Sequence, residues 1–483
     1  MSGEALHALD SVFVTMDSAN APLHVGMLIE LEHRSSTTSD RIARFGEIRQ
    51  HIEDRLGNVA VLRRRILRVP FDLGPPLLVD DPEFDIDFHV VRRAVPSPGG
   101  AKELEALIAR VMARPLAPDR PLWEISVIEG MANGGHALLA KVHHALADGV
   151  SGVTVFSGLF DLGPDVAPPA EQAPVDDAPP LPSPIELLAR SSSELLRRPG
   201  AILEALGSTL ERLAGKVDEL TGAAVPDEDE VSGGPTLLDA PRTPLTGTVS
   251  YARNFERFRV DLGAVKAATS PYGGTVTDFA MAIVGGALRT LLEARGEVVE
   301  RDLVCFTPVN IRVPGTEGDL GNMISGKLDP LMVEILDPFE RLAALSARSR
   351  EVREAGERPA DFINELAEAA GPAVASFAGR VISAFDLFEH LPNVANVIVS
   401  SVPGPPVPLW CAGEQIVRAS PMGPLMFNQA LNITLLGYAG TLEFGILACA
   451  KKVPDAALLC RLLEEEAATL LGRTGSATTA QGA

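Results

Sequence analysis

Apolar positions recur with the periods of helices and strands in the N-terminal part of the chain. Residues 102–114 (KELEALIARVMAR) place apolar side chains on one face of a predicted amphipathic helix. Residues 137–143 (ALLAKVH) form a short apolar run after two glycines, which is typical of a buried strand. This part of the chain therefore mixes element types.

The C-terminal part shows the same mixture. Residues 275–295 predict a long helix, for which Thr277 is a candidate N-cap. Within it, FAMAIVGGAL (279–288) is too short to span a membrane and predicts a buried segment. Residues 455–471 predict an amphipathic helix that closes the pattern. Strands are predicted for LVCFTPV (303–309), NVIVSSV (396–402) and LNITLLGY (431–438).

Two polar stretches rich in proline separate these parts, at residues 163–184 and 226–244, with leucines at helical spacing between them. We therefore expect a mixed α/β (α+β) protein with two domains. The predicted units are an N-terminal domain over 1–162, a connector over 163–247, a C-terminal domain over 248–472 and a disordered tail over 473–483.

Composition narrows the function. The 483 residues carry a net charge of −22, which disfavours a sequence-independent nucleic-acid binder. Arginines cluster at residues 63–68 and 92–93, and solvated surface side chains are a better interpretation of them than an anion site. The 4 cysteines show no zinc or disulfide spacing. The N-terminus lacks the pattern of a signal peptide, and no apolar run is long enough for a membrane span, so we expect an intracellular protein.

Two adjacent histidines follow the strand predicted at 137–143. Side chains alternate across a strand, so His143 and His144 point to opposite faces. His144 shares its face with Val142 and Ala140, the drier face, which favours it as a general base. His143 would support the following turn, in which Asp148 hydrogen-bonds locally and Gly149 relieves a tight conformation. Asp148 orients the His144 ring only if residues 144–148 are helical.

Other interpretations of the pair stay open. Histidine pairs are more often structural than catalytic. His144 and Asp148 could also begin a metal site, but the third ligand that catalytic zinc needs is absent nearby, so we predict no metal. The chain has no nucleophile elbow and no phosphate-binding or dinucleotide-binding glycine motif. A base histidine without a covalent nucleophile suits direct transfer to an acceptor hydroxyl or amine.

The stretch HHALADG (143–149) matches the H-H-x-x-x-D-G motif of CoA-dependent acyltransferases. Pro121, Leu122 and Trp123 resemble the Pro-Leu-Trp motif of one branch, the bacterial wax ester synthase/diacylglycerol acyltransferase family. Further blocks in family order extend the resemblance over about residues 5–471: LHALDSVFVTMDSANAPLHVGML (6–28), FDIDFHVVR (84–92), TPVNIR (307–312), LGNMIS (320–325) and SSVPGPPVPL (400–409).

The resemblance implies two similar domains, each like chloramphenicol acetyltransferase, with a channel between them and His144 near its middle. It also implies a reaction without a covalent acyl-enzyme or a cofactor. His144 would take the proton of the acceptor hydroxyl, whose oxygen attacks the acyl-CoA thioester. Long-chain acyl-CoA would be the donor, and diacylglycerol or a fatty alcohol the acceptor. Contact with a membrane or lipid body would be peripheral.

Candidate oxyanion or channel residues are Asn432, Thr434, Ser401 and Thr277. Two positions depart from the family pattern: Thr277 precedes Asp278 where Asn is common, and Ser401 replaces another Asn. We interpret Asp278 as structural and Trp123 as a core anchor. These departures, with the leucine-rich connector, motivate the alternative of a catalytically weak lipid-binding or lipid-body-associated relative. A metal-dependent hydrolase using His144 and Asp148 is a third alternative.

Overall fold

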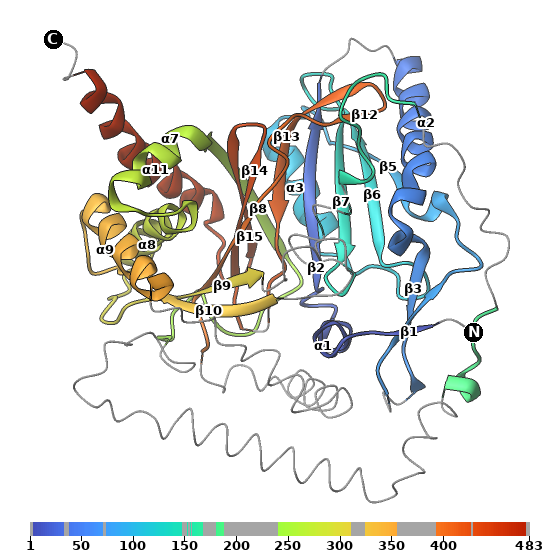
Figure 1. Ribbon diagram of the computed structural model, residues 1–483, viewed down its shortest axis with the longest axis horizontal. Helices are drawn as coiled ribbons and strands as arrows, with labels where there is room; N and C mark the ends of the chain where they lie inside the picture. The colour runs from blue at the N-terminus through green and yellow to red at the C-terminus, as the bar shows by residue number, and fades with distance from the viewer. Residues whose placement is uncertain are drawn as a thin grey trace, which may run out of the picture.

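The computed structural model describes residues 3–32, 38–70, 74–146, 152, 155, 157–167, 180–187, 240–310, 324–354, 393–426 and 428–479. These residues form two halves, each built on a sheet of six strands (Figure 1). The predicted connector helices, Asp148, Gly149 and the TPVNIR–LGNMIS region beyond Asn310 fall largely or wholly outside the described residues.

The first sheet carries the predicted strand 137–143 at its centre, where both faces are covered. All seven positions of this strand are buried, and apolar residues at 137–140 and 142 suit such burial, because no face of the strand meets water. The strand order is β12-β13-β2-β7-β6-β5. These strands are β12 (Trp410–Cys411), β13 (Glu414–Met422), β2 (His24–Leu31), β7 (Ala137–His143), β6 (Trp123–Glu129) and β5 (Val90–Ala94).

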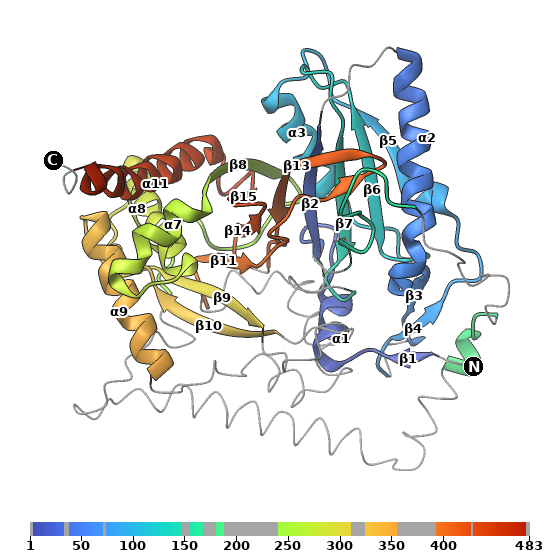
Figure 2. The ribbon, with the colours of Figure 1, turned by 45° about the horizontal axis from the view of Figure 1, so that its top comes forward.

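Helices cover the two faces of this sheet and bury two apolar clusters. α1 (Ala8–Met16) and α2 (Thr38–Arg55) pack on one face with Ile48, Ile52 and Trp123. α3 (Ala101–Met112) packs on the other face through Leu104 and Ile108, as its apolar periodicity predicts. A small sheet, in the order β1 (Glu4–Ala5), β4 (Leu77–Asp80), β3 (Arg64–Leu67), lies beside the first half (Figure 2).

The second sheet has the order β10-β9-β11-β14-β15-β8, and helices gather on one of its faces (Figure 1). The three runs predicted as strands are strands here. The members of this half are β8 (Arg253–Asp261), α7 (Leu262–Thr269), α8 (Val276–Ala294), β9 (Val304–Asn310), β10 (Ile324–Pro330), α9 (Pro338–Glu354), β11 (Val397–Val402), β14 (Leu431–Tyr438), β15 (Thr441–Cys449) and α11 (Ala456–Thr479).

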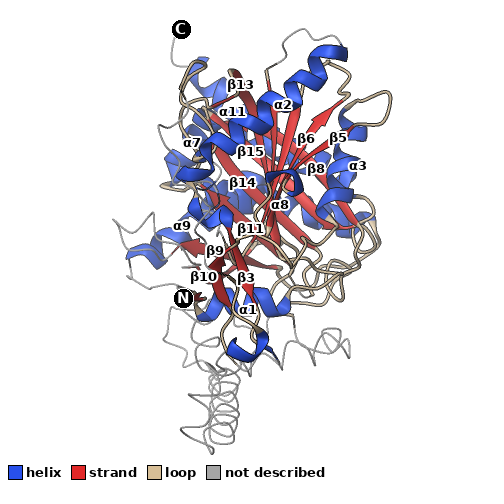
Figure 3. Cartoon of the chain, turned by 90° about the vertical axis from the view of Figure 1, so that its right-hand side faces the viewer, coloured by secondary structure: helices blue, strands red, loops and turns tan. Residues whose placement is uncertain are grey.

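Residues 410–422 leave the second half and complete the sheet of the first. β13 pairs antiparallel with β2, with Ala419 opposite Ile29. This pairing satisfies the open backbone groups of β2, which would otherwise be an exposed edge. The sheets approach closely at Gly445, where an added Cβ would lie 1.7 Å from the Pro421 carbonyl oxygen. The predicted division at residues 1–162 and 248–472 thus needs this exchange of strands as an exception. Figure 3 shows the strands of the structure with helices packed around them.

Two local details differ from expectation. α8 begins after Thr275, whose hydroxyl accepts the Asp278 N–H, so Thr275 rather than Thr277 is the N-cap. α11 continues to Thr479, into the tail predicted as disordered, because a glycine at 472 lowers helix stability by only about 1 kcal/mol and need not end the helix. The segment 279–288 is buried as predicted.

The arginine clusters lie among carboxylates. Arg64 contacts Glu4 at 3.0 Å, Arg92 contacts Glu129 at 2.8 Å, and Arg93 contacts Glu124 at 2.9 Å. Among the described helices, none alone is long and apolar enough to cross a membrane. The segment Leu262–Tyr272 and α8 meet that test only as a pair, bent by 91°.

Candidate functional site

The histidine pair lies where β7 ends, at the junction with β2. His143 pairs with His24 across the two strands. The His143 N–H donates to the Leu122 carbonyl at 2.9 Å, and the His144 N–H donates to the Leu23 carbonyl at 2.9 Å. Hydrogen bonds to Leu122 and Leu23 therefore hold the backbone of both histidines. The two residues differ in the surroundings of their rings.

His143 is a buried, neutral side chain, only 2% exposed. Its Nδ1 accepts the Ala145 N–H at 3.1 Å, which supports the turn after β7 as predicted. Its Nε2 therefore carries the proton, and it lies 3.9 Å from the Asp17 carboxylate. Burial, and secondarily the His144 charge, lower the pKa of His143 to about 3. The ring stays neutral near pH 7.

His144 is half-buried and follows the last residue of the strand. Its ring stacks on Phe13 of α1, with centroids 4.4 Å apart and planes 25° apart. The expected contrast between a dry and a wet face is absent, since Val142 and Lys141 on opposite faces are 0% and 2% exposed. The two rings differ instead in access, because His144 lies beyond the strand and His143 within it.

The C-terminus of α3 contacts Lys141 and His24, which lie beside the histidine pair. Lys141 Nζ donates to the Val111 and Arg114 carbonyls at 3.2 and 2.8 Å. His24 Nε2 donates to the Met112 carbonyl at 2.8 Å. These bonds satisfy carbonyls that a helix end leaves without partners, and a cation suits that end of the helix dipole. Burial lowers the pKa of Lys141 to about 8 and that of His24 well below its usual value.

The Pro-Leu-Trp motif lies beside the pair across the sheet. The Leu122 carbonyl is the acceptor for His143, and Trp123 pairs with Val142. Trp123 is 2% exposed, its Nε1 donates to the Leu62 carbonyl at 2.6 Å, and its ring stacks on His89. The motif thus anchors the strand from within the core, as the interpretation of Trp123 expects. Pro121 directly precedes Leu122 in the sequence.

The second half presents polar groups on the face of β14 that meets the first half. Asn432 and Thr434 share this face with Leu436, which packs in the apolar cluster of the first half. The Asn432 amide donates to the Pro424 carbonyl at 2.9 Å, and the Thr434 hydroxyl donates to Asn432 Oδ1 at 2.7 Å. Pro424 follows β13, whose Met422 pairs with Gly26, two residues from His24. Asn432 therefore lies toward the end of the sheet that carries the histidines.

Ser401 lies on the other face of its strand. In β11, Ser400 pairs with Thr434 and Ser401 pairs with Leu435. Paired residues share a face, and Leu435 belongs to the core cluster under the helices. The register therefore places Ser400, not the predicted Ser401, on the face of Asn432 and Thr434. The two serines therefore lie on different faces because they are one position apart in the register.

Asp278 belongs to the start of α8. Its carboxylate accepts the Thr275 N–H at 2.7 Å, the Thr275 hydroxyl at 2.9 Å and the Ser349 hydroxyl at 2.5 Å. These bonds form a capping box and join α8 to α9, in agreement with a structural role. Thr277 lies in the first turn of the same helix.

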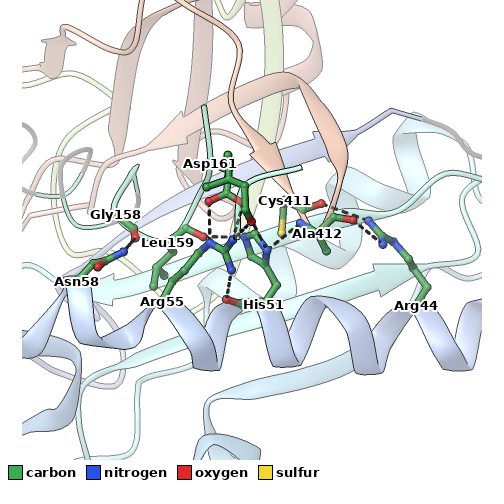
Figure 4. Close-up of polar contacts among 10 residues, drawn as sticks. Arg44, His51, Arg55, Asn58, Gly158, Leu159, Asp161, Cys411 and Ala412 are labelled. Carbon is green, nitrogen blue, oxygen red and sulfur yellow. Dashed lines mark hydrogen bonds and ion pairs between the residues drawn. The ribbon is translucent and has the colours of Figure 1, made fainter. Parts of the chain in front are cut away.

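A polar face of α2 contacts two segments, near residues 160 and 411, and the sequence interpretation missed it (Figure 4). The Arg55 guanidinium donates to both carboxylate oxygens of Asp161, from Nε at 2.8 Å and from Nη2 at 2.6 Å. Arg44 donates to the Cys411 and Ala412 carbonyls and pairs with Glu414 at 2.9 Å. We call the set of Arg44, His51, Arg55 and Asn58 the α2 clasp.

The remaining members of the clasp contact the same segments. His51 Nε2 donates to the Leu159 carbonyl at 3.1 Å, and its Nδ1 accepts the Ala412 N–H at 3.1 Å. Asn58 donates to the Gly158 carbonyl at 3.1 Å. The spacing 44, 51 and 55 keeps three of these residues on one face of α2, and Asn58 lies in the 3-10 turn Leu56–Asn58 that follows. This spacing is a signal that the sequence contains. The segments that they bind come from distant parts of the chain, which the sequence does not indicate.

No group of three or more His, Cys, Asp or Glu side chains that could hold a metal ion occurs among the residues that the structure describes. Asp148, the second ligand in the metal hypothesis, lies outside those residues. The described site therefore consists of a half-buried histidine, a buried neutral histidine behind it, and an amide and hydroxyl pair on the facing strand.

Comparisons with known proteins agree over the whole chain. A model described as the wax ester synthase/diacylglycerol acyltransferase catalytic domain matches residues 6–280, and the C-terminal domain of the same family matches residues 320–470. A Mycobacterium tuberculosis protein named as a diacylglycerol O-acyltransferase is 30% identical over 457 residues, covering 94% of this chain and 87% of its own. Another from that organism, named as a probable diacylglycerol O-acyltransferase, is 33% identical over 413 residues, 84% of each chain.

Solved structures give the same result. The wax ester synthase/diacylglycerol acyltransferase from Marinobacter aquaeolei VT8 matches with a TM-score of 0.67 and 26% identity, over 98% of this chain and 100% of that one. A condensation domain of the calcium-dependent antibiotic synthetase shares the fold, with a TM-score of 0.56 and 16% identity over 98% and 96% of the two chains. Because both family models match and the relatives extend over nearly its full length, the chain belongs to the wax ester synthase/diacylglycerol acyltransferase family.

Proposed function

We propose that this protein transfers a long-chain acyl group from acyl-CoA to diacylglycerol or a long-chain alcohol, with His144 as the general base. The observation that carries the proposal is the contrast within the histidine pair. His144 is half-buried and follows the end of β7, while His143, one residue earlier, is 2% exposed. A base needs both access to the acceptor hydroxyl and a fixed ring.

The reaction begins when His144 accepts the proton of the acceptor hydroxyl. The freed oxygen attacks the thioester carbonyl, the tetrahedral oxyanion collapses, and the same imidazolium protonates the CoA thiolate. The stack on Phe13 and the bond from the His144 N–H to Leu23 support a fixed ring position. His143 remains neutral because burial lowers its pKa to about 3. It therefore adds no positive charge beside the imidazolium that forms.

The oxyanion needs hydrogen-bond donors, each worth about 3 kcal/mol when well placed. Asn432 is the better donor of the facing pair. Its amide has two N–H groups, one of which is given to Pro424. The Thr434 hydroxyl has only one hydrogen, which is given to Asn432. Thr434 therefore orients Asn432, and Ser400 replaces Ser401 as the nearby hydroxyl.

The acyl donor supplies CoA as a substrate, so the reaction as written needs no metal and no further cofactor. Diacylglycerol and long-chain alcohols are poorly soluble in water, so the protein would meet them at a membrane or lipid-body surface. We propose that this contact is peripheral, on the cytoplasmic side. Flotation with liposomes that contain diacylglycerol tests the contact, and full recovery in the unbound fraction would contradict it.

The test of the function is product analysis with purified protein. Palmitoyl-CoA is offered with diacylglycerol or with hexadecanol, and the lipid product is separated and identified. Triacylglycerol or wax ester formed at a rate proportional to enzyme supports the proposal, and the preferred alcohol names the enzyme. Acyl-CoA binding without any ester from either acceptor would overturn it in favour of a lipid-binding relative. The intact mass after incubation with palmitoyl-CoA alone is expected to stay unchanged.

A further inference from the structure

The loop at residues 18–22 connects the two elements that hold His144. Before it, α1 supplies Phe13, whose ring stacks on the His144 ring. After it, Leu23 leads into β2, and the Leu23 carbonyl accepts the His144 N–H at 2.9 Å. In Figure 1, α1 lies at the lower end of β2. A change in the position of this loop would therefore move both the ring and the backbone of His144.

Asp17 closes the loop at its base. Its carboxylate accepts the Leu23 N–H at 2.7 Å, and its own N–H donates to the Phe13 carbonyl at 3.1 Å. Within the loop, Ser18 Oγ accepts the Ala21 N–H at 3.1 Å. These bonds join the end of α1 to the start of β2, so the loop and its two neighbours are expected to move together.

The tip of the loop contacts the second half. Ala21 is buried and belongs to the apolar cluster of the second half, together with Leu245 and Val249. The Asn20 carbonyl accepts a hydrogen bond from Arg253 Nη2 at 2.6 Å. Arg253 is the first residue of β8, so this bond joins the loop to the second sheet.

Arg253 is itself fixed within the second half. Its Nη1 donates to the Ser250 carbonyl and, at 3.3 Å, to the Ala252 carbonyl. The Ser250 N–H donates to Cys449 Sγ at 3.3 Å, which holds this turn against β15. Burial lowers the pKa of the Arg253 side chain to about 10, so the guanidinium still carries its charge at pH 7. A guanidinium donates to several carbonyls at once in a fixed geometry, which a lysine does not reproduce.

Arg253 lies at the same end of the second sheet as Asn432. Arg253 pairs with Cys449 of β15. The neighbouring residue of β15, Ala448, pairs with Leu431, which directly precedes Asn432. Two strand spacings, or about 10 Å, therefore separate Arg253 from the start of β14. The bond from Arg253 to the loop thus links the sheet that carries the proposed oxyanion donor to the contacts that hold the proposed base.

We propose that Arg253 is a positioning residue for the acyl transfer, because it holds the loop at residues 18–22 against the second half and so sets where the His144 ring lies relative to Asn432. The proposal rests on the proposed function. Arg253 acts through the loop and not through contact with a substrate. Its effect on the rate can be large, because a misplacement of about 1 Å at a reacting group costs about 100-fold.

The test is Arg253→Met, which keeps a long side chain but removes the donors. Arg341→Met is the matched control. Arg341 is 1% exposed and donates to the Ala282 and Ile335 carbonyls within the second half. It also pairs with Glu466, so its loss should disturb the fold at least as much. The values of kcat and KM are measured with palmitoyl-CoA and the preferred alcohol, below the melting temperature of every variant.

We expect Arg253→Met to lower kcat by about 10- to 100-fold and to leave KM within about threefold of wild type, because only the reacting geometry changes. Arg341→Met should keep kcat within about threefold of wild type. Arg253→Lys, which keeps the charge, should lose less than Arg253→Met. A kcat of Arg253→Met within about threefold of wild type, or equal losses in the two methionine variants, overturns the proposal. If Arg253→Met does not fold, Arg253→Lys is held to the same limits.

A second readout needs no turnover. When the rings of the 9 histidines carry ¹³C, the ring resonance that is absent from His144→Ala belongs to His144. The stacked ring of Phe13 shifts this resonance through its ring current. The resonance should move toward that of an unstacked histidine in Arg253→Met and stay in place in Arg341→Met.

An unchanged His144 resonance in Arg253→Met overturns the proposal. If wild type makes no ester, that failure belongs to the proposed function, and the resonance alone then decides whether Arg253 positions the ring.

Discussion

Two histidines that are neighbours in sequence have different chemistry because the strand ends between them. His143 shares a buried face with Lys141, and its Nδ1 accepts a hydrogen bond from the Ala145 N–H in the following turn. His144 stacks on Phe13 and stays half-buried. The alternation of a strand predicts opposite faces, but it does not predict that both faces are covered. Access therefore follows from where the strand ends, which is a property of the fold.

The bond that His143 accepts from Ala145 can be tested by substitution. His143→Ala leaves that buried N–H without its acceptor, which costs about 1–3 kcal/mol. His143→Asn keeps a carbonyl oxygen in the side chain and should recover part of this free energy of unfolding. Urea unfolding of wild type and both variants measures the difference. Equal losses in the two variants would contradict a role for this bond.

Gly445 is required by the close approach of the two sheets. Any Cβ at this position would lie 1.7 Å from the Pro421 carbonyl oxygen, which is backbone and cannot rotate away. We expect Gly445→Ala to destabilise the protein by about 1–3 kcal/mol, as overpacking does. Gly472→Ala is the matched control, since nothing lies within 4 Å of its added Cβ and helical alanine is favourable. Thermal unfolding that ranks Gly445→Ala as the more stable variant would refute this account.

At the scale of elements, α2 joins parts of the chain that sequence distance separates. Arg55 and Asp161 are 5% and 9% exposed, so each charge depends on the other. The clasp also holds the crossover at residues 411–412, through Arg44 and His51. α2 therefore stabilises the strand exchange as well as its own domain.

Removing one partner of a buried ion pair leaves an uncompensated charge. Arg55→Met alone should therefore cost about 3–5 kcal/mol of the free energy of unfolding. The double variant with Asp161→Asn should lose less than the sum of the single losses, because no lone charge remains. Arg92→Met, which breaks a pair in which Arg92 is 39% exposed, should cost at most about 1 kcal/mol. Additive losses in the double-mutant cycle would exclude this coupling.

Elements with strong local patterns were predictable, and their partners were not. The strand 137–143 and the buried helix segment 279–288 agree with their apolar patterns. Residues 414–422 form a strand, but no local feature shows that it joins the first sheet, because pairing is decided by tertiary contacts. The same reason explains the change from Ser401 to Ser400. One position in a register moves a side chain to the other face.

At the scale of the whole molecule, charged groups cross the boundary between the halves. Glu105 of α3 faces Glu256 and Arg257 of β8, with Arg257 at 3.6 Å, and Arg257 also pairs with Glu30. Burial and then Glu256 raise the pKa of Glu105 to about 7, although Arg257 and Arg418 act to lower it. Burial outweighs the ion pair because two acidic side chains share the guanidinium.

This raised pKa predicts a pH-dependent stability. Between the unfolded value of 4.5 and about 7, the folded state holds the proton more tightly, so this group's contribution to stability falls as pH rises. Glu105→Gln should therefore raise the melting temperature relative to wild type at pH 8 and have little effect near pH 5. Melting curves at both pH values measure this difference. An equal loss at both would show that the pair with Arg257 dominates.

The most direct test of the account is the rate of ester formation by His144→Ala. The variant should retain the wild-type melting temperature and palmitoyl-CoA affinity, because the ring of His144 is half-buried and lies beyond the strand. Its kcat with palmitoyl-CoA and the preferred alcohol should fall by about 100- to 10,000-fold. A folded variant whose kcat stays within about tenfold of wild type would contradict the assignment of His144 as the base.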